Sequence, residues 1–338
     1  MLGHEVSNQQ NREPVILVTG GAGYIGSRLS RDLAADLRFS NCTIRIYDNL
    51  QRQHFCGLMD LPTGGCYEFV EGDILDRLNL ERAMHGVSVV VHLAAIVKTP
   101  LSFDHPEWTG QVNHWGTAAV VDCALNTGVP RLIYASSASV YGPGGPFREI
   151  DTCHPIGPYA ISKRKGEENV LQGGERGLRF TIVRLGTAFG NAPAMRFDAV
   201  ANRFTYLVGV GRPMVIHGSG EQIRPLIHVR DASAVLRLCL ADSKTEGEII
   251  NAAMMNPSVN EIAHTLQAIV PDATIRYTDQ DILTEISFEV DSAKLMGMRF
   301  RPQFSLEQGL EEMLARWREF RPALSNAVAH LGKSEDWL

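Results

Sequence analysis

Long apolar runs and dense basic clusters are both missing from this sequence. It contains no stretch of 18 consecutive apolar residues, and a helix needs about that many to cross a bilayer. Lys and Arg form no dense cluster, and the net charge is −6 with a pI of about 6.0, whereas nucleic-acid-binding surfaces are basic. We therefore expect no membrane span and no nucleic-acid partner.

The sequence also lacks the spacing patterns of metal sites and the apolar region of a signal peptide. Its 6 cysteines form no C-x-x-C pair, and its 11 histidines include no H-E-x-x-H motif. We therefore expect reduced thiols and no bound metal. The polar residues 1–14 are expected to be a disordered tail of a cytoplasmic protein.

What is present is an ordinary globular composition with alternating strand and helix patterns. The 338 residues are 44% hydrophobic and 21% charged, enough to bury a substantial core. Apolar strand patterns alternate with amphipathic helix patterns, which predicts an α/β fold with a doubly wound parallel sheet. The main expected strands are 15–19, 43–48, 67–70, 87–93, 131–136, 179–185 and 248–251, and the main expected helices are 24–36, 106–126 and 159–171.

A glycine-rich turn follows the first strand. Gly20, Gly21 and Gly23 allow backbone to approach a ligand closely, and Gly26 lets the next helix lie against the strand. The N-terminus of that helix would face a pyrophosphate. Asp48 ends the second strand 22 residues after Gly26, near the spacing of about 20 for a carboxylate that binds an adenosine ribose. The pattern predicts NAD rather than NADP, with a solvated turn aspartate as the alternative.

Further polar and small residues follow the next strands. Asp73 could accept a hydrogen bond from adenine or cap the following helix. Ala94 and Ala95 follow a strong apolar strand, where small side chains would let a cofactor lie against the backbone, although close helix packing would use them equally well.

The residues suited to chemistry lie near the middle of the chain. Ser137 follows a strand, and Tyr159 and Lys163 are about one helical turn apart. An ammonium near a phenol favours phenolate, so we expect Lys163 to lower the pKa of Tyr159 from about 10, and an oxidised nicotinamide would act in the same direction. Tyr159 could then exchange a proton with a substrate hydroxyl as hydride leaves carbon, with Ser137 hydrogen-bonded to the same oxygen. The alternative is a buried tyrosine beside a snorkelling lysine.

Together these motifs resemble the extended short-chain dehydrogenases/reductases, and most closely their nucleotide-sugar epimerase/dehydratase branch. The resemblance covers Val15 to about Phe320 and also includes His92-Leu93-Ala94-Ala95, Ser136-Ser137-Ala138-Ser139-Val140-Tyr141-Gly142 and Ile227-His228-Val229-Arg230-Asp231. It implies a Rossmann fold, a catalytic triad of Ser137, Tyr159 and Lys163, and an NAD site formed by Gly20, Gly23, Tyr24, Ile25, Asp48, Asn49, Leu50, Asp73, Ile74, Leu93, Ala94, Ala95, Asn113, Ser136, Tyr159 and Lys163.

The resemblance also implies a domain organisation. The Rossmann domain is expected over residues 15–185, completed by 226–251, and a smaller mixed α/β substrate-binding lobe over 186–225 and 252–322. Residues 323–338 are expected to be a peripheral tail. A helix is expected to start at Ala194 and reach about Val208. His228 is expected to be a packed core histidine and Asp231 to cap the helix through Leu240.

Substrate contacts are expected mainly from the second half of the chain. Arg224 matches a family position that pairs with a nucleotide diphosphate, which a planar guanidinium suits. Thr187 stands where many relatives have asparagine, and Thr284-Glu285-Ile286-Ser287 offers no second arginine. These departures leave the sugar and nucleotide open. The expected substrate-binding residues are Lys98, Ser137, Ser139, Thr187, Arg196, Asn202 and Arg224.

Two residues narrow the expected reaction. Relatives that eliminate water carry acids just before Val-Tyr-Gly, where this chain has Ala138 and Ser139. Neither can transfer a proton at neutral pH. This favours an NAD-dependent nucleotide-sugar 4-epimerase with a transient 4-keto intermediate. The alternatives are a dehydrogenase or ketoreductase acting on a sugar nucleotide or another secondary alcohol, a decarboxylase, and a non-catalytic cofactor-sensing protein. By the same resemblance we expect a homodimer formed by the helices 106–126 and 159–171.

Overall fold

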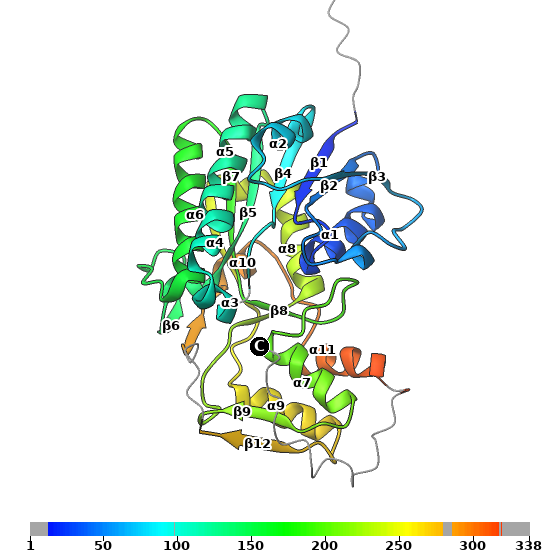
Figure 1. Cartoon of the computed structure of the whole chain (residues 1–338), viewed down its shortest axis with the longest axis vertical. Helices are drawn as coiled ribbons and strands as arrows, with labels where there is room; N and C mark the ends of the chain where they lie inside the picture. The colour runs from blue at the N-terminus through cyan, green and yellow to red at the C-terminus, as the bar shows by residue number, and fades with distance from the viewer. Residues whose placement is uncertain (1–12, 98, 280–285, 318, 320–338) are drawn as a thin grey trace, which may run out of the picture.

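A parallel seven-stranded sheet forms the centre of the larger lobe in the computed structural model, which describes residues 13–97, 99–279, 286–317 and 319 (Figure 1). The strand order is β11-β7-β5-β4-β1-β2-β3. This confirms the predicted doubly wound fold. The strands are β1 (Val15–Thr19), β2 (Thr43–Asp48), β3 (Cys66–Glu71), β4 (Val87–His92), β5 (Arg131–Ser137), β7 (Arg179–Leu185) and β11 (Glu248–Ala252).

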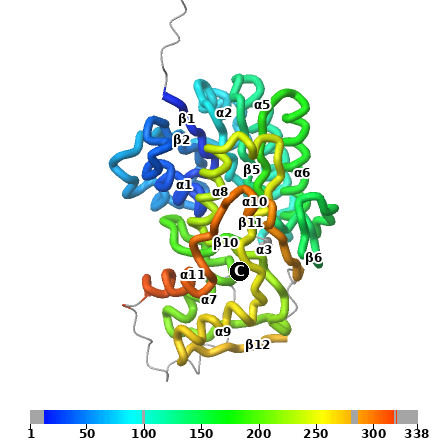
Figure 2. The backbone as a smooth tube through the Cα atoms, turned by 180° about the vertical axis from the view of Figure 1, so that it is seen from behind, coloured from blue at the N-terminus to red at the C-terminus, as the bar shows by residue number. Residues whose placement is uncertain are grey.

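Helices cover both faces of this sheet. On one face α1 (Tyr24–Ala35) packs against α8 (Val229–Ala241). The other face is covered by α2 (Arg77–Met84), α5 (Gly116–Thr127) and α6 (Gly157–Glu175), seen together in Figures 1 and 2. The central strands are therefore buried on both sides, and Val90 and Val91 of β4 are fully inaccessible. No helix in the described part of the chain is long and apolar enough to span a bilayer.

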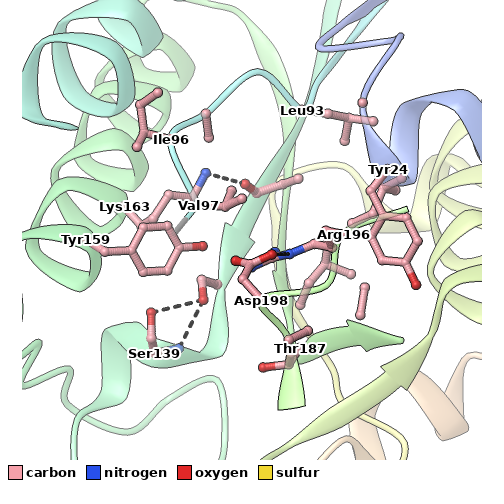
Figure 3. Close-up of a pocket in the computed structure, with 18 of the residues that line it drawn as sticks. Tyr24, Leu93, Ile96, Val97, Ser139, Tyr159, Lys163, Thr187, Arg196 and Asp198 are labelled. Carbon is pink, nitrogen blue, oxygen red and sulfur yellow. Dashed lines mark hydrogen bonds and ion pairs between the residues drawn. The ribbon is translucent and has the colours of Figure 1, made fainter. Parts of the chain in front are cut away.

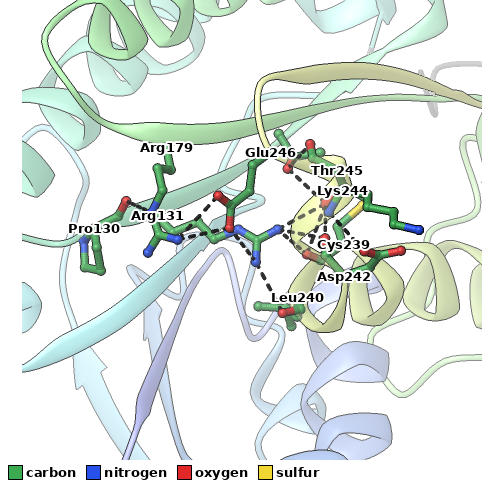
Figure 4. A network of polar contacts seen from close by, with 10 residues as sticks. Pro130, Arg131, Arg179, Cys239, Leu240, Asp242, Lys244, Thr245 and Glu246 are labelled. Carbon is green, nitrogen blue, oxygen red and sulfur yellow. Dashed lines mark hydrogen bonds and ion pairs between the residues drawn. The ribbon is translucent and has the colours of Figure 1, made fainter.

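Arg131 is the first residue of β5, and it links the sheet to the C-terminal end of α8 (Figure 4). Its guanidinium donates to the Cys239 carbonyl at 2.5 Å and to Thr245 Oγ1 at 3.0 Å. Glu246 lies 3.5 Å from Arg131 and 3.1 Å from Arg179. A cation at a helix C-terminus satisfies carbonyls that have no intrahelical partner.

The smaller lobe lies beyond the carboxyl ends of the strands (Figures 1 and 2). It contains α7 (Val200–Gly209), α9 (Val259–Ile269), α11 (Leu306–Leu314) and the parallel pair β9 (Met214–His217) and β12 (Ile275–Thr278). In the larger lobe α3 (Thr99–Asp104) and α4 (Pro106–Gly110) pack against α6, and α10 (Ala293–Gly297) packs against β11. Two parallel strand pairs are separate from the main sheet: β8 (Thr187–Phe189) with β10 (Leu226–His228), and β6 (Gly144–Phe147) with β13 (Phe288–Val290).

The helix expected over 106–126 is confirmed: helical backbone runs without a break from α4 to α5, through a π-helical turn at Gln111–Trp115. Two local expectations are wrong. The helix expected from Ala194 begins only at Val200. Asp231 does not cap α8: the buried His228 is the N-cap and accepts from Arg230 N at 3.4 Å, while Asp231 accepts from Gln303 N at 2.9 Å.

Candidate functional site

A cavity of about 560 Å³ lies between the carboxyl ends of the strands and the smaller lobe. In a doubly wound sheet, ligands bind where the strand order reverses, and here that point lies between β1 and β4. Most residues expected at the site line this cavity: Gly20, Gly23, Tyr24, Ile25, Asp48, Asn49, Leu50, Asp73, Ile74, Leu93, Ala94, Ala95, Ser136, Ser137, Ser139, Tyr159, Lys163, Thr187, Arg196 and Arg224.

The glycine turn forms one wall of the cavity and leaves no room for larger residues. Gly20 has a φ of +69°, and a Cβ there would lie 2.7 Å from Ala94 N. A Cβ on Gly26 would collide with the carbonyl oxygen of Gly20. The helix α1 begins directly after the turn at Tyr24. Its first N–H groups lack intrahelical partners and suit a phosphate.

The two carboxylates expected near the adenosine are held at defined positions. Asp48 Oδ2 accepts from Ala22 N at 3.0 Å, and its Oδ1 accepts from Leu50 N at 2.9 Å. Burial raises the pKa of Asp48, and the two backbone hydrogen bonds oppose the increase. Asp73 accepts from Asn49 Nδ2 at 2.8 Å, and Asp76 rather than Asp73 caps α2. Asp48 is thus tied to the glycine turn, which fits a dinucleotide site.

Ser137 and Tyr159 meet on the opposite wall. Ser137 ends β5, and its Oγ lies 2.9 Å from Ser139 Oγ. Tyr159 projects from the first turn of α6, and its hydroxyl points into the cavity (Figure 3). The geometry places a proton-transfer group and a second hydroxyl beside the same space.

The expected effect of Lys163 on Tyr159 is absent from this structure. Lys163 Nζ donates to the Ala135 carbonyl at 2.6 Å and lies 4.3 Å from the centre of the Tyr134 ring. Burial raises the pKa of Tyr159, while Ser137 and Arg196 lower it and Asp198 raises it. The expectation of a lowered pKa is therefore wrong here, because removal of the phenol from water outweighs the favourable contacts.

Two asparagines expected at the site lie behind its walls. Asn113, on the π-helical turn, is 1% exposed. Its Oδ1 accepts a hydrogen bond from Ile96 N at 2.7 Å, and its Nδ2 donates one to the Ile96 carbonyl at 2.9 Å. These two hydrogen bonds fix the position of Ile96, which lines the cavity. Asn202 of α7 is also 1% exposed, and it donates to Tyr24 Oη at 3.1 Å and accepts from Gly190 N at 3.2 Å. Both residues support the walls, and neither lines the cavity.

The expected substrate-binding arginines have partners within the protein. Arg196 forms an ion pair with Asp198 at 2.6 Å in the middle of the cavity (Figure 3). Burial would raise the pKa of Asp198, but the hydrogen bonds and charge of Arg196 outweigh it and lower the pKa. Arg224 donates to the Ile286 carbonyl at 2.8 Å. Lys98, Thr284 and Glu285 lie outside the described residues.

Several cavity residues were not expected from the sequence. They lie on the loop after β2, in the segment before α7, on α7, on β9 and in the segment leading to β10, where no contiguous motif marks them. Their shared feature is a polar or charged side chain on an element that only the tertiary fold brings to the cavity: Arg52, Asp198, Arg203, His217 and Gln222.

Comparisons with known proteins agree with this geometry. The chain is 28% identical over 322 residues to the dTDP-D-glucose 4,6-dehydratase of Bos taurus, covering 90% of this chain and 88% of the relative. It is 30% identical over 315 residues to the UDP-glucuronate 4-epimerase of Thermodesulfobacterium geofontis, and the match covers 87% of this chain and 93% of that relative. The structure also resembles the crystal structure of UDP-glucuronic acid 4-epimerase from Bacillus cereus in complex with UDP-glucuronic acid and NAD. The TM-score is 0.81 at 25% sequence identity, and the match covers 91% of this chain and 100% of that chain.

Epimerase and dehydratase relatives are thus about equally similar, and they share one family. The sequence profile of the NAD-dependent epimerase/dehydratase family matches residues 16–253. The glycine turn and Asp48 lie on one wall of the cavity and are tied together through Ala22 N. The chain therefore belongs to the NAD-dependent epimerase/dehydratase family, a branch of the extended short-chain dehydrogenases/reductases.

Proposed function

We propose that this protein is an NAD-dependent nucleotide-sugar 4-epimerase. The observation that carries the proposal is the combination of Ser137 and Tyr159 at the cavity with Ala138 and Ser139 in the following turn. Elimination of water needs an acid and a base in addition to the redox tyrosine. Among the described cavity residues, the carboxylate whose charge acts on Tyr159 is Asp198, which forms an ion pair with Arg196. Reversible oxidation at one carbon needs no further proton-transfer group.

Tyr159 acts as base and then as acid in this reaction. The phenolate form of Tyr159, which the positive charge of an oxidised nicotinamide would favour, takes the proton of the sugar C4 hydroxyl while the C4 hydrogen leaves as hydride, which produces a 4-keto sugar. Ser137 hydrogen-bonds to the same oxygen and holds it at Tyr159. After the sugar has turned, Tyr159 returns the proton as hydride is added to the opposite face of C4.

The residues that would hold NAD are those already placed around the cavity. The backbone of the glycine turn would bind the pyrophosphate, Asp48 would bind the adenosine ribose, and Lys163 would bind the nicotinamide ribose. Bound NAD supplies the hydride acceptor and donor. A carboxylate at position 48 repels a ribose 2′-phosphate, which favours NAD over NADP.

The substrate we propose is a nucleoside diphosphate sugar. Arg52, Arg196, Arg203 and Arg224 line the same cavity, and guanidinium groups suit phosphate oxygens. The named relatives act on UDP- and dTDP-linked sugars. This supports the substrate class without selecting the base or the sugar.

A panel of UDP-, GDP-, CDP- and dTDP-sugars tests the proposed reaction. We expect one sugar nucleotide to be converted to its C4 epimer without net consumption of added NAD, as followed by proton NMR. Net NAD reduction would favour the dehydrogenase, release of carbon dioxide the decarboxylase, and a 4-keto-6-deoxy product the dehydratase. Each of these outcomes would contradict the epimerase.

We further propose that the protein is a homodimer built on α5 and α6. Trp115, directly before α5, is 62% exposed, and Ile161 of α6 is 41% exposed. We expect Trp115→Glu to convert a dimer of two 37.2 kDa chains into monomers, because it buries a charge in an apolar interface. Light scattering coupled to gel filtration measures this. Leu37→Glu, at an 89% exposed position outside these helices, should leave the dimer intact, and a monomeric wild type would refute the proposal.

A further inference from the structure

The hydroxyl of Tyr24 joins the glycine turn to the segment that precedes α7. Tyr24 is the first residue of α1, directly after the turn, and only 7% of it is exposed. Its hydroxyl donates to the Gly190 carbonyl at 2.5 Å and accepts from Asn202 Nδ2 at 3.1 Å. Burial raises the pKa of Tyr24 above its usual value, so the hydroxyl keeps its proton and remains a donor. A buried tyrosine hydroxyl needs such partners, and both of them lie far along the chain, after β8 and in α7.

Asn202 extends this link to the backbone of Arg196. Asn202 lies in the first turn of α7 and is 1% exposed. Besides its bond to Tyr24, its Nδ2 donates to the Arg196 carbonyl at 2.8 Å, and its Oδ1 accepts from Gly190 N at 3.2 Å. One side-chain amide therefore holds two points of the chain before α7 and connects both of them to the Tyr24 hydroxyl.

The segment that these bonds hold carries charged cavity residues. Residues 190–199 form neither helix nor strand, so their position depends on side-chain contacts rather than on a regular hydrogen-bond ladder. The segment contains the ion pair of Arg196 with Asp198, and in the view of Figure 3 Arg196 lies between Tyr24 and Tyr159. The bonds of Tyr24 and Asn202 therefore help to fix where Arg196 enters the cavity.

We propose that Tyr24 is a positioning residue: because its hydroxyl ties the glycine turn to Gly190 and Asn202, binding of NAD at the turn orders the segment that carries Arg196. The proposal rests on the proposed function, in which Arg196 contacts the sugar nucleotide. Binding of one ligand that orders a segment lowers the entropic cost of binding the next ligand there. Bound NAD should therefore raise the affinity for the sugar nucleotide, and the sugar nucleotide should raise the affinity for NAD by the same factor.

Hydrogen–deuterium exchange followed by mass spectrometry tests this link, with NAD alone as the ligand. In the wild type we expect NAD to slow amide exchange both in the glycine turn, residues 20–26, and in residues 190–199. In Tyr24→Phe the slowing at 20–26 should remain, and the slowing at 190–199 should fall about tenfold, as expected for the loss of a buried hydrogen bond. A purely structural hydroxyl would contribute to stability but would leave the effect of NAD on residues 190–199 unchanged.

Tyr47→Phe is the matched control. Tyr47 is also buried and lines the cavity, but its hydroxyl donates to the Asp73 carbonyl at 2.8 Å, within the larger lobe. The effect of NAD on residues 190–199 should be the same in this variant as in the wild type.

Asn202→Ala removes the link from the other side and provides a second test if Tyr24→Phe does not fold. We expect the slowing at 190–199 to be lost in this variant as well. Wild-type slowing at 190–199 in whichever of the two variants folds would overturn the proposal. So would a wild type in which NAD protects only the glycine turn.

The KM for the accepted sugar nucleotide provides the functional readout. In Tyr24→Phe we expect KM to rise about tenfold with little change in kcat, because a binding group is displaced and the reacting groups are not. The Kd of NAD alone should be nearly unchanged. A wild-type KM in Tyr24→Phe would overturn the link from Tyr24 to the substrate. If the wild type epimerises no sugar nucleotide, the proposed function fails, but the exchange measurement still decides whether Tyr24 connects the turn to residues 190–199.

Discussion

Tyr159→Phe is expected to lower kcat roughly 10³-fold, a loss within the range attributed to general acid–base catalysis. The substitution removes the hydroxyl that points into the cavity (Figure 3) and retains the ring that packs there. No other described side chain on this wall can replace it: Ser137 and Ser139 are hydroxyls of much higher pKa, and Lys163 donates to Ala135. Initial rates on the accepted sugar nucleotide measure the loss, and NAD binding measured separately should be nearly unchanged.

Tyr67→Phe is the matched control for this experiment. Tyr67 lies on β3, and its hydroxyl donates to the Pro62 carbonyl at 3.1 Å, away from the cavity lining. We expect full activity in that variant. A Tyr159→Phe protein that retains wild-type activity would show that the cavity binds NAD without using this tyrosine, as a cofactor-sensing protein would.

The main sheet was predictable because each of its strands can be identified from the pattern of its own residues. Strands such as β4 are mostly apolar, and segments whose pattern fits a helix on the sheet, such as α2, alternate with them. The helix expected to start at Ala194 does not form there, and the cause is local. Arg196 and Asp198 hydrogen-bond to each other at 3.0 and 2.6 Å, and residues two apart in a helix point to different sides. This ion pair therefore keeps the segment irregular up to Ala199, and α7 starts one residue later.

The site was predictable where its residues are contiguous in sequence. The glycine turn and the Ser136–Ser139 stretch reach the cavity because each lies at the carboxyl end of a strand. Spacing alone could not show which way Lys163 points, because its amine reaches a backbone carbonyl of the neighbouring strand. Nor could it show that Asn202 bonds Tyr24 across the two lobes. Such contacts depend on tertiary packing.

Gly26→Ala is expected to weaken NAD binding about 30-fold. An alanine Cβ at this position would collide with the Gly20 carbonyl oxygen and lie 2.6 Å from Gly21 Cα. Both atoms are backbone, so a side-chain rotation cannot relieve the contact and the glycine turn itself must move. Overpacking of this kind costs about 1–3 kcal/mol, and about 2 kcal/mol corresponds to about 30-fold in Kd. Calorimetric titration of cofactor-free protein with NAD measures the change.

Gly64→Ala adds the same methyl group at a position where a Cβ would meet no atom within 4 Å, and it should bind NAD as the wild type does. The comparison distinguishes a specific effect on the turn from a general loss of chain flexibility, which both substitutions cause in the unfolded state. Because the turn is held to Asp48 through Ala22 N, its displacement should also disturb the carboxylate at the ribose end. Equal NAD affinity in the two variants would mean that the turn before α1 is not where the dinucleotide binds, and the redox role of Tyr159 would lose its basis.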